Sequence, residues 1–161
     1  MLSKINSMLS SSDPSNIKLG VTLLESLYPT EYAALAAEWQ PWAAVFGANV
    51  ADTIARNGLG KIDCSGMKLR KIPALPKTVK VLYCIDNRLT SLPAMPNVQV
   101  LHCSHNQLSA LPKLPLLHKL VCWNNQLSTL PELPLLHTLY CWDNPFKNPQ
   151  ALLELYPFAQ M

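Results

Sequence analysis

Apolar residues recur through the second half of the chain with a fixed period of 19 or 20 residues. Cysteine marks this period, because all five cysteines share one phase: Cys64, Cys84, Cys103, Cys122 and Cys141. Around them run an aliphatic column at Ile62, Leu82, Leu101, Leu120 and Leu139, an asparagine column at Asn87, Asn106, Asn125 and Asn144, and an apolar column at Leu69, Leu89, Leu108, Leu127 and Phe146. Such a period predicts a solenoid of stacked, nearly identical rungs.

Side-chain alternation next to each cysteine predicts a short strand in every rung. In Leu82-Tyr83-Cys84, the leucine and the cysteine point to one side and the tyrosine to the other. One rung cannot bury its apolar side, but parallel stacking makes a continuous core. We therefore expect an α/β fold with five parallel rungs over residues 61–148, free buried thiols, and asparagine amides that satisfy backbone groups at the turns.

Helical segments are expected at both ends of this array. Helix-start signals over residues 1–60 lie at Asp13-Pro14, Thr30-Glu31, Gln40-Pro41 and Asn49. They predict a helical N-terminal cap in which Trp39, Trp42 and Phe46 are buried. Asn148-Pro149 predicts a C-terminal capping helix within residues 149–161, which would cover the last rung with Leu152, Leu153 and Tyr156.

The rungs follow the pattern L-x-x-L-x-L-x-x-N-x-L, with cysteine at its third apolar position and Leu-Pro pairs at Leu92-Pro93, Leu111-Pro112 and Leu130-Pro131. Residues 61–148 resemble the bacterial leucine-rich-repeat family with short L-P-x-L-P repeats, found in effector adaptors and in substrate-recognition domains of effector ubiquitin ligases. The resemblance implies a curved solenoid whose concave strand face recognises a protein. Those ligases carry a Cys-x-Asp motif in a separate catalytic domain; Cys141-Trp142-Asp143 matches it by letters, but Cys141 is in phase with the buried column and is rejected as a nucleophile.

Charge and composition limit the classes of function and the kinds of partner that are expected for this chain. The chain is 49% hydrophobic and 14% charged, which indicates a folded protein. Six cations and one acid cluster over residues 61–80, a patch for an acidic partner or simply a solvated face. Because the basic residues stop near Lys80, no nucleic-acid partner is expected. No membrane span and no secretory signal are visible, so a cytoplasmic location is expected, with effector-type secretion and the oligomeric state, including a monomer, left open.

Catalytic and metal motifs are absent from the pattern. His102-Cys103-Ser104-His105 contains metal-binding residue types, but alternation sends Cys103 inward and His102 outward, so they form no compact ligand set. No nucleophile elbow or glycine-rich phosphate loop is present. We expect no enzyme activity, no metal and no cofactor.

Large side chains at outward strand positions are the candidate site, because core packing does not require them there. They and their polar neighbours are Tyr83, Ile85, His102, His105, Trp123, Asn124, Tyr140, Trp142 and Asp143. Exposed Trp and Tyr are typical of interfaces. The sequence predicts a protein-protein interaction module that binds a protein or peptide, with carbohydrate binding as the alternative; a third interpretation is that the rings stiffen the sheet.

Overall fold

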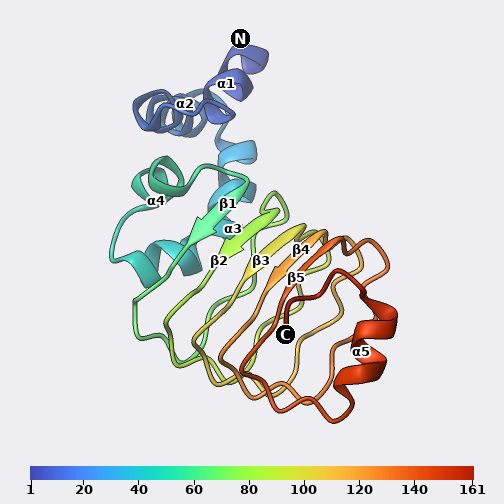
Figure 1. Cartoon of the computed structure of the whole chain (residues 1–161). Coiled ribbons are helices and arrows are strands. Elements are labelled where there is room, and N and C mark those ends of the chain that lie inside the picture. The colour runs from blue at the N-terminus through green and yellow to red at the C-terminus, as the bar shows by residue number, and fades with distance from the viewer. The chain divides into compact units, whose positions relative to one another are not determined.

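The computed structural model describes residues 1–161, and its chain forms two compact units. The first contains residues 1–61 together with 76–78, and the second contains residues 62–75 and 79–161. Figure 1 shows helices in the first unit and a parallel sheet followed by one helix in the second. None of the helices is long and apolar enough to cross a lipid bilayer.

The first unit contains four helices: α1 (Leu2–Leu9), α2 (Pro14–Leu27), α3 (Pro29–Phe46) and α4 (Val50–Asn57). The predicted starts of α2 and α4 are confirmed by their caps. The Asp13 carboxylate accepts a hydrogen bond from the Ser15 amide at 2.8 Å, and the Asn49 side chain accepts one from the Asp52 amide at 2.8 Å. These acceptors satisfy amides that the first helical turn leaves unpaired.

The predicted helix start at Gln40-Pro41 is wrong, because α3 continues through Pro41. A proline inside a helix removes one backbone hydrogen bond and costs about 3 kcal/mol. Here Pro41 lies on the exposed side of the helix, while Trp39 and Trp42 are fully buried. Burial of two indole rings offsets the lost bond, so tertiary packing keeps the helix continuous.

The predicted burial of the cap aromatics is confirmed for Trp39 and Trp42. Phe46 is half-buried; its ring centroid lies 6.0 Å from that of Trp42, and the Arg56 guanidinium carbon lies 5.0 Å from the Phe46 ring. These rings therefore belong to the helical core and present no open aromatic pocket.

The second unit is a parallel β-solenoid of about four turns. Its strands are β1 (Lys61–Asp63), β2 (Val81–Tyr83), β3 (Val100–His102), β4 (Lys119–Val121) and β5 (Thr138–Tyr140), and they follow one another in sheet order (Figure 1). We number the rungs one to five by these strands. The register joins equivalent residues, so that Leu82, Leu101, Leu120 and Leu139 are successive partners across the sheet. The predicted parallel stacking is confirmed.

The cysteine column forms part of the buried core, as predicted. All five thiols are free and their residues have no solvent exposure. Burial raises the pKa of the Cys64 thiol to about 12, with a further contribution from Asp63, and raises the pKa of Cys141 to about 11. Burial likewise holds the pKa of Cys84, Cys103 and Cys122 well above the ordinary value. The thiols are therefore neutral, small apolar groups.

The asparagine column joins neighbouring rungs through their backbones. The Asn106 amide nitrogen donates to the carbonyl oxygens of Cys84, Cys103 and Ser104 at 2.9 to 3.2 Å, and its oxygen accepts from the Leu89 amide at 3.0 Å. Asn87, Asn125 and Asn144 repeat this arrangement in their own rungs. The prediction that these amides satisfy backbone groups at the turns is confirmed.

The chain beyond β5 closes the second unit with a helix and a short backbone pairing. Helix α5 (Pro149–Leu155) is capped by the Asn148 side chain and buries Leu152, and the Tyr156 hydroxyl accepts from the Leu133 amide at 3.2 Å. Gln160 then pairs in parallel with Tyr140: its amide donates to Leu139 and its carbonyl accepts from Cys141, both at 2.9 Å. This pairing, which the sequence did not predict, covers backbone groups that an edge strand exposes.

Candidate binding surface on the strands

The candidate site occupies the solvent side of the strands, which we call the strand face. We define it by two columns of outward side chains in rungs two to five: Tyr83, His102, Val121 and Tyr140, then Ile85, Ser104, Trp123 and Trp142. Neighbouring rungs are about 4.8 Å apart, so large equivalent side chains in successive rungs lie within reach of each other. All residues of this face lie within the second unit.

The last three rungs bring four rings together in what we call the aromatic cluster: His105, Trp123, Tyr140 and Trp142. Trp123 and Trp142 stack with centroids 5.2 Å apart and planes 18° apart. His105 meets Trp123 edge to face at 4.1 Å, and Tyr140 meets Trp142 edge to face at 5.9 Å. All four residues are half-buried, so their rings contact one another and remain open to solvent in part.

A second ring contact lies in the lower rungs, where Tyr83 and His102 meet edge to face at 6.1 Å. Burial lowers the pKa of His102 and the charge of Lys119 lowers it further, while Asp63 acts in the opposite direction. The ring is therefore neutral at neutral pH. Its Nε2 atom is buried without a hydrogen-bond partner.

The smaller residues of the strand face are covered by their large neighbours. Ser104 has no solvent exposure although its column points outward, and Val121 is only 8% exposed. The Ser104 hydroxyl has no hydrogen-bond partner. Alternation alone predicts that both side chains are exposed. This prediction fails because alternation does not take account of the size of the neighbouring rings in rungs four and five.

The polar residues beside the strands also have a backbone role. Gly66, Asp86, His105, Asn124 and Asp143 occupy one column, and all of them have φ between 52° and 71°. Outside glycine, Asp, Asn and His are the residues that enter this left-handed region most readily. The turn therefore explains part of the choice of His105, Asn124 and Asp143, which the sequence assigned to binding alone.

These turn residues nevertheless border the aromatic cluster. His105 Nδ1 lies 2.7 Å from the Asn124 amide nitrogen, so the two side chains form a hydrogen bond across neighbouring rungs. Asn124 and Asp143 are exposed, whereas Tyr83 and Ile85 are half-buried and lie three rungs away from Trp142. The predicted residues thus form one surface, which carries the aromatic cluster in rungs three to five and only Tyr83 and Ile85 in rung two.

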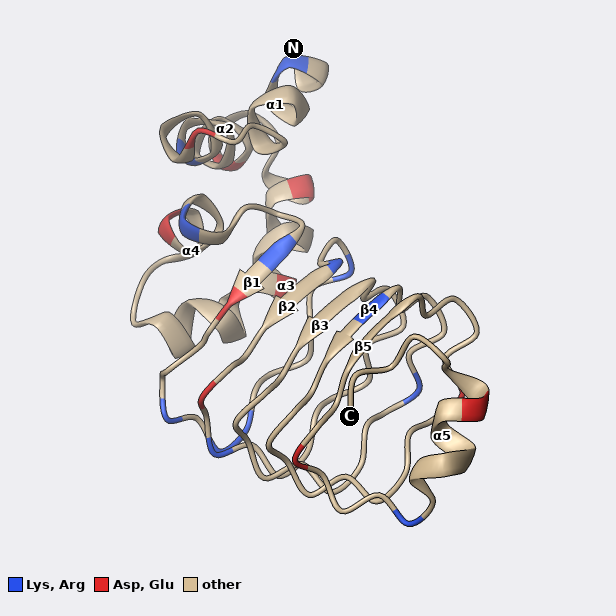
Figure 2. Cartoon of the chain, in the orientation of Figure 1, with Lys and Arg blue, Asp and Glu red and all other residues tan.

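Lys119 is a strand-face residue that the sequence analysis missed. It begins β4, is exposed, and pairs with Val100 and Thr138 in register. It is the one charged residue within β2 to β5, and Figure 2 shows a basic segment in β4. The alternation that selected Trp123 also selects Lys119, which lies four residues earlier in the same rung and on the same side of the strand, so the signal was present in the sequence.

Two sequence features with apparent chemistry, the His/Cys cluster and the Cys-x-Asp match, can be compared with the structure. The structure has no group of three or more His, Cys, Asp or Glu side chains placed to hold a metal ion. Cys141, the apparent match to a Cys-x-Asp motif, is buried and its raised pKa keeps it a neutral thiol, which is a poor nucleophile. No protein-family model matches the sequence, and no significant match to a curated protein is found.

Proposed function

We propose that this chain is a leucine-rich-repeat protein of the short L-P-x-L-P type that binds a protein or peptide across its strand face and catalyses no reaction. The repeat pattern, the buried cysteine column and the asparagine column support the repeat assignment. The aromatic cluster supports the binding role.

The observation that carries the proposal is that two indole rings stand in a column where the fold does not require them. Rungs one and three place serine there, at Ser65 and Ser104, and rung two places Ile85. The strands of these rungs pair in the same register as those of rungs four and five. Large partly exposed rings at such positions are typical of interfaces, where Trp and Tyr supply much of the binding energy.

A protein or peptide fits the geometry of this cluster better than a sugar does. Sugar-binding platforms use an open ring face, but the nearly parallel stack closes the facing sides of Trp123 and Trp142, and His105 contacts Trp123 from the rung before. The partly open rings are bordered by the Asn124 amide and the Asp143 carboxylate, both exposed. Apolar groups edged by donors and acceptors suit a polypeptide, which carries both kinds of group.

Carbohydrate binding is the second candidate, favoured by the presence of Trp and Tyr side by side. It requires that one ring of the cluster turn its face to the ligand. A glycan array separates the candidates: glycan binding that disappears in Trp123→Ala supports the second, and peptide binding that disappears in the same variant supports the first.

The test is selection from a displayed random-peptide library on the whole immobilised chain, followed by affinity measurement. We expect the double variant Trp123→Ala/Trp142→Ala to weaken binding of selected peptides by about thirtyfold or more, since truncating one interface hot spot costs about 2 kcal/mol.

The matched control removes exposed apolar side chains away from the strand face. Leu116 and Leu135 are 40% and 47% exposed and lie in the segments between strands. Leu116→Ala/Leu135→Ala should leave peptide affinity unchanged. Equal losses in the control and the tryptophan variant, or no loss in either, would contradict the proposal.

A further inference from the structure

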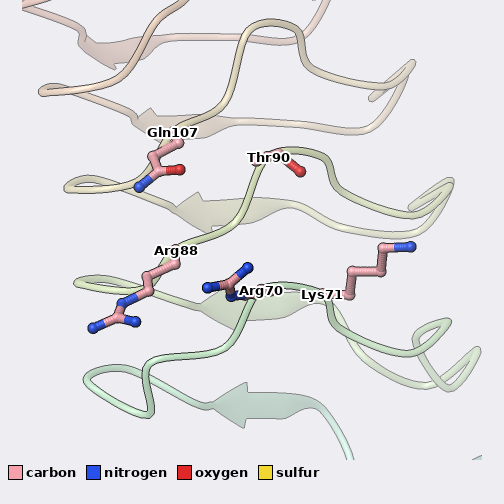
Figure 3. Close-up of a pocket in the computed structure, with 5 residues that line it drawn as sticks. All are labelled: Arg70, Lys71, Arg88, Thr90 and Gln107. Atoms are coloured by element: carbon pink, nitrogen blue, oxygen red, sulfur yellow. The ribbon is translucent and has the colours of Figure 1, made fainter.

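A cationic pocket lies outside the strand face, in the turns that follow the first strands. It has a volume of about 300 Å³ and is lined by Arg70, Lys71, Arg88, Thr90 and Gln107 (Figure 3). In Figure 3 the Arg88 side chain extends toward the turn on the left, Arg70 lies between Arg88 and Lys71, and the Lys71 ammonium extends to the right. No acidic residue lines the pocket.

The backbone of the solenoid places these side chains in two columns. The Arg88 amide donates to the Leu69 carbonyl at 2.8 Å, which holds Arg88 beside Arg70. One rung later the Gln107 amide donates to the Leu89 carbonyl at 2.9 Å, which holds Gln107 beside Thr90. The pocket therefore takes Arg70 from rung one, Arg88 and Thr90 from rung two, and Gln107 from rung three.

The two arginines are not balanced by carboxylates. Lys18 pairs with Asp52 and Lys77 pairs with Glu38, whereas neither Arg70 nor Arg88 forms an ion pair with a carboxylate. Two like charges that line one pocket repel each other, and an anion bound in that pocket would reduce the repulsion. The arrangement is thus more favourable with a bound anion than without one.

Folding does not require cations at these positions. Later rungs carry glutamine in the Arg88 column, at Gln107 and Gln126, and serine in the Arg70 column, at Ser109 and Ser128. The same backbone bond is made with the neutral residue, because the Gln126 amide donates to the Leu108 carbonyl at 2.9 Å. Figure 2 shows basic segments at the turns after β1 and β2 that are absent from the turns after β3 and β4.

We propose that Arg70 and Arg88, with Thr90 and Gln107, form a binding site for a phosphate monoester. Guanidinium forks match the oxygens of phosphate in geometry and charge, and they do so better than an ammonium does. The Thr90 hydroxyl and the Gln107 amide donate hydrogen bonds to the remaining oxygens. The phosphate belongs either to a phosphorylated side chain of another protein or to a free phosphorylated small molecule. This proposal does not depend on partner binding at the strand face.

The direct test is titration of the whole chain with inorganic phosphate at constant ionic strength, followed by NMR of backbone amides and arginine side chains. We expect saturable shifts centred on residues 70, 88, 90 and 107. The double variant Arg70→Ser/Arg88→Gln places in this pocket the residues that later rungs use, so it should fold normally by circular dichroism. It should lose about tenfold or more in phosphate affinity, the equivalent of one lost charge-assisted contact.

Two matched variants make the result specific. Lys80→Gln/Lys113→Gln removes the same number of charges from exposed positions that do not line this pocket, and it should keep the phosphate affinity within about twofold. Thr90→Arg/Gln107→Arg, added to Arg70→Ser/Arg88→Gln, moves the pair up one rung. The phosphate-induced shifts should then move to residues around Ser109 and Gln126.

Comparison of a phosphoserine peptide with glycerol phosphate distinguishes the two sources of the phosphate. Tighter binding of the peptide assigns the site to a phosphorylated protein, and equal binding assigns it to a small molecule. The proposal is overturned if phosphate shifts the amides near every exposed lysine alike, or if the arginine and lysine double variants lose affinity equally.

Discussion

The buried and the solvent-facing columns of the same rungs obey opposite rules. Inside, every rung has an aliphatic residue, then cysteine, and rungs two to five add asparagine at the same place. Outside, one column changes from Ser65 through Ile85 and Ser104 to Trp123 and Trp142. Because the buried columns repeat in every rung, the exterior is free to vary, and this variation is where the proposed binding surface lies.

The exterior itself differs between the first and the last rungs. The turns after β1 and β2 carry Arg70 and Arg88 without acidic partners, and rungs four and five carry the stacked indoles. Both features lie on rungs with the same repeated backbone, so the fold alone explains neither the unpaired arginines nor the stacked indoles.

Alkaline pH should cause the largest loss of stability, because it acts on all five buried thiols at once. An unfolded thiol ionises above about pH 8.5, whereas the folded thiols stay neutral, up to about pH 11 for Cys141 and about pH 12 for Cys64. Above the unfolded pKa the unfolded state binds fewer protons than the folded state, so the free energy of unfolding falls as pH rises. Each buried thiol should remove about 1.4 kcal/mol per pH unit in this window.

Urea unfolding at about pH 7, 9 and 10 measures this loss. Cys103→Ala is the control, because it should reduce the slope of stability against pH by one proton while lowering stability at neutral pH through the lost side chain. A free energy of unfolding that stays level up to about pH 10 would contradict the burial of the thiol column.

Loss of one interior asparagine should have the next largest effect. Asn106→Leu leaves the Leu89 amide and the Cys84 and Cys103 carbonyls without their side-chain partner. Each buried unpaired group costs about 1 to 3 kcal/mol, so the variant should lose about 3 kcal/mol or more in urea unfolding. Asn144→Leu in the last rung should lose less, because Asn144 is half-buried and water reaches its surroundings. Equal losses of unfolding free energy in Asn106→Leu and Asn144→Leu would show that the degree of burial of the asparagine does not matter.

The stacked indoles provide a test of the exterior. A double-mutant cycle of Trp123→Ala and Trp142→Ala should give a coupling energy of about 1 kcal/mol, which is typical of an aromatic pair. Such a value means that the rings contact each other without holding the sheet together. A coupling of several kcal/mol would assign them to stiffening of the sheet and would remove the main support for the proposed binding surface.

Ser104→Ala should have the smallest effect and the opposite sign. The Ser104 hydroxyl is buried without a hydrogen-bond partner, and such a group destabilises the fold. Its removal should raise the free energy of unfolding by about 1 kcal/mol or less, measured by urea unfolding. Ser65→Ala is the matched control, since the Ser65 hydroxyl accepts from the Ile85 amide at 3.2 Å and its loss should lower stability. Destabilisation in both variants would mean that the Ser104 hydroxyl is satisfied in solution.

Local patterns predicted the elements whose partners repeat along the chain. Cys103 and Asn106 were placed correctly because each rung is preceded and followed by a copy of itself. The start of α2 at Asp13-Pro14 was found for a similar reason, since capping acts within a few residues. Pro41 was misjudged because its penalty is local, while the burial of Trp39 and Trp42 that offsets it depends on the fold of the whole helical unit.

Other features had no local signal at all. Nothing near Gln160 indicates that it pairs with Tyr140, because the pairing follows from where α5 returns the chain. Helix α1 carries no side-chain cap, so it lacks the start signal that marked α2. The predicted strand-face residues do share one surface, but the exposure of each was not predictable from alternation, which treats Ser104 and Trp123 alike.

The sequence alone determined the rung: its period, its strand, and which side chains face inward, because alternation and stacking depend on neighbours that the repeat itself supplies. The tertiary structure decided which outward groups remain accessible and which charges meet. Burial of Ser104, stacking of Trp123 on Trp142 and the placement of Arg70 and Arg88 around one pocket all involve different rungs, and each depends on side-chain sizes and charges that the period does not specify.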